Sequence, residues 1–156
     1  MLTTQTMSAA PPSALRTRLD AITGALGRLP LGVLQLAFRL AIASVFLKAG
    51  FNKLASWEIT IQLFRDEYKV PVLPPEIAAA MATTFELGCS ALLIAGLATR
   101  LATLPLLGMI CVIQLFVYPD AYAEHLTWAS ILAFLLTRGA GPFSLDRLLG
   151  LEPPQN

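Results

Sequence analysis

Two side chains of opposite charge fall inside long apolar stretches of the sequence. Arg39 lies about eight residues into the stretch 31–54, and Glu86 lies about ten residues into the stretch 76–98. At helical rise, each is therefore well inside its stretch. In a lipid bilayer, one such charge at the centre costs about 2.5–3.5 kcal/mol on insertion scales. If the two stretches are antiparallel helices, we expect both side chains near mid-membrane. A guanidinium and a carboxylate at matched depth predict a bidentate ion pair.

Further polar side chains follow the same helix faces. At 100° per residue, Gly50 and Lys53 fall on the face of Arg39, with Gly50 allowing close helix packing. On the second stretch, Ser90 shares the face of Glu86. Gln114 of the third stretch is a candidate to join this polar patch.

Two other residues have more than one interpretation. Arg100 follows the second stretch, where it either joins the site or serves only as a positive charge at the cytoplasmic surface. His125 is the single histidine. It could relay protons, although we expect an exposed histidine at the outer membrane boundary. The candidate intramembrane pocket therefore consists of Arg39, Lys53, Glu86 and Arg100, with Gln114 and His125 as further candidates.

The chemistry of this pocket stays open at this point. An Arg39–Glu86 pair could simply fix the register of two helices, or it could line a pocket for a quinone headgroup, a small acid or a proton. The chain carries no GxSxG, Walker, dinucleotide-binding or HExxH motif, so no catalytic residue is predicted. Cys89 and Cys111 are far apart and lie in apolar stretches. We expect two small buried side chains rather than a redox pair or metal ligands.

Composition indicates the environment of the chain. Of 156 residues, 56% are hydrophobic and only 13% are charged, whereas soluble domains are about a quarter charged. A surface that meets lipid does not need charge, so a lipid bilayer is the predicted surrounding. The net charge of +1 offers no basic field for nucleic acid.

The lengths of the apolar stretches predict the fold. A membrane-spanning helix needs about 20 mostly apolar residues, and four stretches meet or approach this length: 31–54, 76–98, 101–118 and 122–137. Prolines and glycines separate them, including Pro75, Gly96, Pro119 and Gly139, while Pro105 is expected to kink the third. The predicted fold is an all-α, antiparallel four-helix bundle integral to the membrane.

Lysine and arginine in short loops predict the orientation, because they favour the cytoplasmic side. The loop between the third and fourth stretches has neither residue. Both termini are therefore predicted to be cytoplasmic, on the side of Arg16, Arg18, Arg28, Arg100, Arg138 and Arg147.

Two further segments have one apolar face. In the arm 1–30, leucines and an isoleucine repeat at helical spacing, which predicts an amphipathic helix lying on the cytoplasmic leaflet; a disordered arm is the alternative. The stripe of this arm consists of Leu15, Leu19, Ile22, Leu26 and Leu29. The second segment carries the stripe Trp57, Ile61, Phe64 and Tyr68. It predicts a short interfacial helix over the extracytoplasmic end of the bundle, with Ser56 as its cap. Residues 151–156 form a short tail.

Three segments together resemble the DoxX family of small four-helix membrane proteins. They read RLAIASVFLKAGFNKL from Arg39, ELGCSALLIAGLATR from Glu86 and GAGPFSLD from Gly139. The likeness covers roughly 34–148, within a domain expected over 31–150. It implies a bundle in the bacterial inner membrane, with Arg39, Lys53, Glu86 and Arg100 as family-matching polar positions. Named members include a subunit of thiosulfate:quinone oxidoreductase, and others are linked to redox complexes.

Three functions are therefore compared. The first is an accessory, quinone-proximal subunit of a membrane oxidoreductase system, with quinone as the candidate cofactor and a soluble or membrane redox partner. The second is a transporter of protons or small solutes, which intramembrane charges also fit. Four helices without an inverted repeat suit alternating access only if the chain forms a homo-oligomer. The third is a non-catalytic membrane scaffold.

Overall fold

The computed structural model describes residues 14–26 and 30–152, and within these ranges all regular structure is helical. The chain divides into two units, Met1–Pro30 and Leu31–Asn156. The first contains α1 (Ala14–Leu26), so its described part is helical rather than disordered. Leu15 and Leu19 are exposed on it, while Leu29 lies outside the described residues. Exposed leucines one helical turn apart are what an interfacial helix needs.

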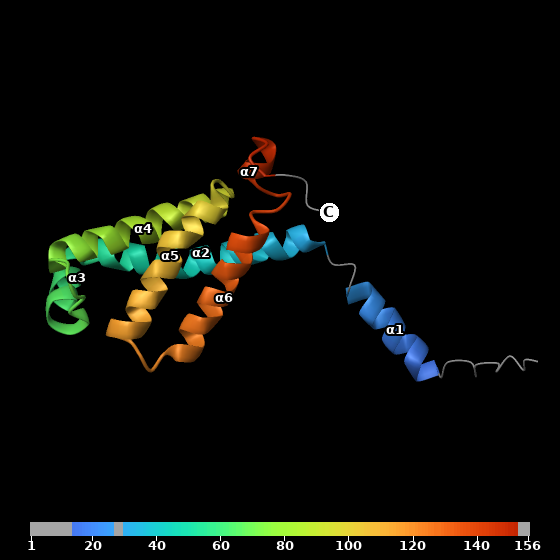
Figure 1. The fold of residues 1–156 in the computed structure, drawn as a ribbon, viewed down its shortest axis with the longest axis horizontal. Helices are drawn as coiled ribbons and strands as arrows, with labels where there is room; N and C mark the ends of the chain where they lie inside the picture. Colours follow the sequence, from blue (N-terminus) through green and yellow to red (C-terminus); the bar gives the residue numbers. More distant parts are fainter. Residues whose placement is uncertain (1–13, 27–29, 153–156) are drawn as a thin grey trace, which may run out of the picture. The chain divides into compact units, whose positions relative to one another are not determined.

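Four long helices form the second unit (Figure 1). They are α2 (Leu31–Ala55), α4 (Pro75–Ala95), α5 (Thr99–Val112), which continues as the π-helix η2 (Ile113–Val117), and α6 (Tyr122–Arg138). Helix α2 packs along α4, α4 contacts α5, α5 contacts α6, and α6 contacts α2. Three of the four, namely α2, α4 and the continuous α5–η2, are long and apolar enough to cross a membrane. Helix α6 extends over about 25 Å at 1.5 Å per residue.

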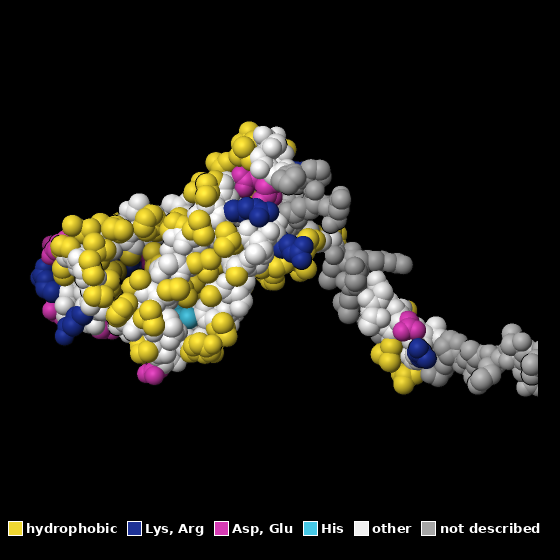
Figure 2. Space-filling view, in the orientation of Figure 1, with side chains coloured by type: hydrophobic (Ala, Val, Ile, Leu, Met, Phe, Trp, Pro, Cys, Tyr) yellow, Lys and Arg dark blue, Asp and Glu magenta, His cyan; other side chains and the backbone are white. Residues whose placement is uncertain are grey.

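The inside and the outside of this unit are both apolar. Its core contains Phe46 from α2, Leu93 from α4, Leu106 from α5 and Leu132 from α6, all buried. Figure 2 shows hydrophobic side chains over the middle of the visible face and charged side chains mainly towards its ends. Soluble monomers rarely expose large contiguous apolar patches, so this surface fits a membrane protein.

The helix ends follow the turn residues in the sequence. Pro75 begins α4, where its missing N–H removes no helical hydrogen bond. Gly96 ends α4 in the left-handed conformation with φ of 66°, which favours glycine because a Cβ is disfavoured there. Helix α5 continues through Pro105, and the change to π-helical hydrogen bonding comes later, at Ile113.

A short helical segment, α3 (Trp57–Leu63) followed by the π-helix η1 (Phe64–Tyr68), links α2 to α4. The predicted stripe of Trp57, Ile61, Phe64 and Tyr68 is buried or half-buried, whereas the charged face is exposed, so its amphipathic character is confirmed. The predicted Ser56 side-chain cap is wrong. A single residue, Ser56, separates α2 from α3, and its carbonyl accepts the first helical hydrogen bond of α3 from the Thr60 amide.

Candidate functional site

Glu86 forms its ion pair with Lys53 and not with Arg39. The Lys53 ammonium lies 2.7 Å from one carboxylate oxygen of Glu86 and 2.9 Å from the other. The Glu86 side chain is 4% exposed and that of Lys53 is 20% exposed. The predicted Arg39–Glu86 pair is therefore wrong, although both members of the actual pair were among the predicted site residues.

The register of α2 against α4 explains the difference. A Cβ placed on Gly50 would lie 3.2 Å from the Glu86 Cβ, so Gly50 is level with Glu86, and Lys53 lies one turn beyond. Arg39 lies about 16 Å from the level of Gly50 and Glu86, counted along the helix axis at 1.5 Å per residue. Counting residues from the helix ends assumed that α2 and α4 are level, but the first turns of α2 extend past the end of α4. Arg39 therefore lies near Gly96 at the end of α4 and not beside Glu86.

Arg39 instead binds the segment that follows α6. Its guanidinium donates to the Ala140 carbonyl at 3.0 Å and to the Phe143 carbonyl at 2.8 Å, and the residue is 1% exposed. Gly96 at the end of α4 faces the same guanidinium. Gln35, one turn earlier on α2, donates to the carbonyl of Gly139. These contacts fasten the chain after α6 to the beginning of α2.

Two acidic residues that the sequence interpretation did not single out complete this end. The Asp146 carboxylate accepts hydrogen bonds from the Ala98 amide at 2.7 Å and the Thr99 amide at 3.0 Å, where the positive end of the α5 dipole favours an anion. Glu152 accepts from the Ala140 amide at 3.1 Å and lies 3.4 Å from the Arg100 guanidinium. We call Arg39, Arg100, Asp146 and Glu152 the terminal cluster.

Arg39 and Arg100 thus belong to a different place from Lys53 and Glu86. Both arginines contact the chain around the end of α6, and neither lines the cavity that Lys53 and Glu86 reach. The residues that the sequence assigned to a single pocket therefore lie at two separate sites. The terminal cluster joins α2, the α4–α5 turn and the segment 139–152, mainly through hydrogen bonds to main-chain atoms. Such contacts stabilise the fold and leave little of the cluster to bind a ligand.

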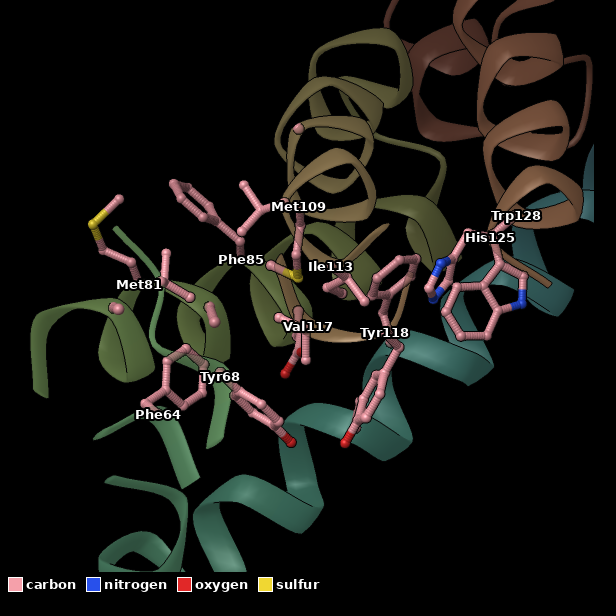
Figure 3. Close-up of a pocket in the computed structure, with 18 of the residues that line it drawn as sticks. Phe64, Tyr68, Met81, Phe85, Met109, Ile113, Val117, Tyr118, His125 and Trp128 are labelled. Atoms are coloured by element: carbon pink, nitrogen blue, oxygen red, sulfur yellow. The ribbon is translucent and has the colours of Figure 1, made fainter. Parts of the chain in front are cut away.

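Lys53 and Glu86 line a cavity of about 820 Å³. Its wall comes from α2, η1, α4, α5–η2 and α6 and is mostly aliphatic and aromatic. Figure 3 shows Phe64 and Met81 on one side of the cavity and His125 and Trp128 on the other. Ligand sites are typically apolar cavities of about 300–1,000 Å³ with a few polar groups that fix orientation. The cavity therefore has the size and the lining of a small-molecule site.

His125 is a buried member of this wall, so the expectation of an exposed histidine is wrong. The residue is 4% exposed, and its Nδ1 lies 2.7 Å from the Gln114 Oε1. The Gln114 amide nitrogen donates to the Pro119 carbonyl at 2.7 Å, which makes Oε1 the acceptor. His125 Nδ1 therefore donates this hydrogen bond, and Nε2 is the ring nitrogen left for a ligand. Gln114 orients His125 and makes no hydrogen bond to Glu86.

Two tyrosines that the sequence did not mark as site residues line the same cavity. The rings of Tyr68 and Tyr118 have centroids 5.9 Å apart. Burial, and then the neighbouring Tyr118, raise the pKa of Tyr68 above its ordinary value, so its hydroxyl is available as a hydrogen-bond donor. Tyr68 was recognised only as part of an amphipathic stripe, because helical spacing does not distinguish a core aromatic from a cavity-lining one.

The two cysteines are free thiols in different environments. Cys89 is buried in the core, as predicted, but Cys111 is exposed on the outer face of α5. Its apolar sequence neighbours reflect an apolar exterior rather than burial. Among the residues that the structure describes, no cluster of three metal-ligating side chains occurs.

Comparison with known proteins identifies a family. The DoxX family model matches residues 34–119, which include both members of the Lys53–Glu86 pair and end before His125. No curated protein and no solved structure matches the chain. Because the matched region covers more than half of the sequence, and because the described structure is all-helical with membrane-length helices, the protein belongs to the DoxX family.

Proposed function

We propose that this DoxX-family protein crosses the bacterial inner membrane four times, through α2, α4, α5–η2 and α6, with both termini in the cytoplasm. The apolar exterior and the loop arginines support this arrangement. Helix α6 is shorter than a hydrocarbon core of about 30 Å; its polar first residues and Arg138 would sit at the two interfaces. The terminal cluster would then be cytoplasmic, and the cavity would lie in the extracytoplasmic half.

We further propose that the cavity binds the headgroup of a quinone and that the protein is an accessory subunit of a membrane oxidoreductase system. The observation that carries this proposal is a cavity of about 820 Å³ in which an apolar wall surrounds one ion pair and one buried histidine. Lys53 can donate a hydrogen bond to a carbonyl oxygen of the headgroup. Glu86 and the Nε2 of His125 can accept one from a hydroxyl group. The donor and acceptor set thus fits both a quinone and a quinol.

The charges of the wall favour a neutral head. The lining contains one ammonium, Lys53, against three carboxylates, those of Glu86, Asp120 and Glu124. A small acid or a phospholipid phosphate would meet more negative than positive charge, and one more uncompensated charge in an apolar setting is costly. This argues against the small-acid ligand that the sequence left open.

The position of the core argues against a transport path. Ile42, Phe46, Leu93 and Leu106 form a buried apolar layer between the cavity and the terminal cluster. A proton or solute that crossed the bundle would have to pass this layer, where the buried polar groups are the uncharged hydroxyls of Ser90 and Thr103 rather than charged side chains.

The proposal is tested by measuring bound quinone. The protein is purified in lipid nanodiscs from native membranes, and quinone is extracted and quantified per protein chain, together with any dehydrogenase that copurifies. We expect near-stoichiometric quinone in the wild type, a loss of tenfold or more in Glu86→Gln, and no change in Glu58→Gln, an exposed position on α3. Absence of quinone from the wild type, also after added quinone, would overturn the proposal.

A further inference from the structure

We infer that the ligand reaches the cavity sideways from the lipid, through an opening between α4 and α5–η2, and that an apolar tail stays in this opening. The inference rests on the proposed function and adds the route and the chemical class: a molecule with a small neutral head and a long hydrocarbon tail. The two helices join at the turn around Gly96 and move apart from there (Figure 1).

The residues on the two edges of this opening are apolar, and they both line the cavity and border its surroundings. On α4 these are Met81 and Phe85, which line the cavity and are 43% and 37% exposed. On α5 they are Gly108, which is exposed, and Met109, which is half-buried. A lining residue that is also exposed marks a place where the cavity communicates with its surroundings. In a bilayer, the surroundings at this depth are acyl chains.

Small and flexible residues leave space for a tail at this place. A Cβ added to Gly108 would meet no atom within 4 Å, so the glycine borders open space. Pro105, one turn earlier, also lines the cavity. Methionine side chains adapt to irregular apolar partners, and Met81 on α4 and Met109 on α5 both line the cavity. The opening can therefore accept a hydrocarbon chain without a preformed narrow tunnel.

The cavity is polar at the other end. The hydroxyls of Tyr68 and Tyr118 lie on the opposite side of the cavity from Phe85 and Met109 (Figure 3). Lys53, Glu86 and His125 supply further charged and hydrogen-bonding groups to the wall. This gradient fixes the orientation of an amphipathic ligand, with its head among the polar groups and its tail towards Gly108. A fully water-soluble ligand would have no use for the apolar opening.

A pair of glycine substitutions tests the route. Gly108 and Gly88 are both exposed helical glycines whose added Cβ would meet nothing within 4 Å, but only Gly108 lines the cavity. Gly108→Phe therefore fills the opening, and Gly88→Phe is its matched control. Trp128 lines the cavity and serves as the fluorescent reporter in a Trp57→Phe background. The probes are a decyl-substituted benzoquinone and the same headgroup without the chain, each titrated as a mole fraction of nanodisc lipid.

We expect the decyl quinone to quench Trp128 at a concentration at least tenfold below that of the tailless head. In Gly108→Phe this advantage should disappear, while Gly88→Phe should behave as the unsubstituted reporter protein. If both glycine variants retain the advantage of the decyl chain, the lateral route is wrong while quinone binding stands. If neither probe quenches Trp128 in the reporter protein, and extraction also finds no quinone, the proposed function fails and the route fails with it.

Discussion

The ammonium of Lys53 on α2 contacts both carboxylate oxygens of Glu86 on α4, at 2.7 and 2.9 Å, one turn beyond Gly50, where an added Cβ would lie 3.2 Å from the Glu86 Cβ. The pair thus fixes the register of α2 against α4, and it also places opposite charges on the wall of the cavity. The Lys53–Glu86 pair therefore has a structural role and a functional role, which substitutions can separate.

Removing one partner of this pair should destabilise the fold much more than removing both. Lys53→Met or Glu86→Leu alone should lower the free energy of unfolding by about 3 kcal/mol, the lower end for a broken buried pair because Lys53 is partly exposed. Lys53→Met combined with Glu86→Leu should recover most of this loss. Unfolding in mixed detergent micelles measures the double-mutant cycle.

An exposed ion pair in the same chain provides the control. Arg65 and Glu76 lie 2.6 Å apart, with side chains 57% and 52% exposed. The same cycle there should give a coupling of about 0–1 kcal/mol. Equal couplings for the two pairs would contradict a buried, register-fixing role for Lys53 and Glu86. If the double variant is stable but no longer retains quinone, the scaffold alternative fails.

Gly96 should tolerate no side chain, in contrast to Gly88. Gly96 has φ of 66°, and an added Cβ would collide with the Arg39 guanidinium and with Ser144. Gly96→Ala should destabilise the protein by about 1–3 kcal/mol through the left-handed backbone alone. Gly88→Ala should stabilise it by about 0.5–1 kcal/mol, because alanine is the better helix former. Thermal unfolding of both variants gives the comparison, and a neutral Gly96→Ala would show that Arg39 is not held at this turn.

Asp146→Ala should loosen the beginning of α5. The carboxylate satisfies two amides, those of Ala98 and Thr99, and loss of such a cap costs about 0.5–2 kcal/mol. Hydrogen exchange of these two amides should accelerate by a factor of about 10 for each 1.4 kcal/mol lost from local stability. Asp120→Ala, at an exposed position in the α5–α6 connection, should leave them unchanged. Unchanged exchange in Asp146→Ala would contradict the assigned cap.

The helices were predictable from sequence because apolar length and turn residues determine them locally. The stretches 31–54 and 122–137 differ from α2 and α6 by one residue at the end, and Pro75 and Gly96 mark the ends of α4 as expected. Lys53 and Glu86 were recognised as site residues for a similar reason, since a charge inside an apolar run is visible without any tertiary structure.

The partners of these charges were not predictable, because they depend on the offset between helices. The first turns of α2 pack against Pro142 and the carbonyls of residues 138–143 rather than against α4, and no local pattern encodes that overhang. Asp146 and Glu152 act from a segment whose path is set by tertiary contacts. His125 was misjudged because its burial and its hydrogen bond with Gln114, eleven residues earlier, are set by tertiary packing.

The proposed orientation makes opposite predictions for the two ends of α6. In a background of Cys89→Ala and Cys111→Ala, a cysteine at position 120 should react in intact cells with a maleimide that crosses the outer but not the inner membrane. A cysteine at position 149 should react only after the inner membrane is permeabilised. Asp120 and Leu149 are both exposed, so a difference in labelling reports the side of the membrane rather than burial. In the chain without these two substitutions, Cys111, exposed on the apolar exterior, should remain unlabelled in intact membranes because hydrated maleimides do not reach acyl chains. Labelling of positions 120 and 149 from the same side would show that α6 does not cross the bilayer, and the cavity would then have a wall that lies outside the membrane.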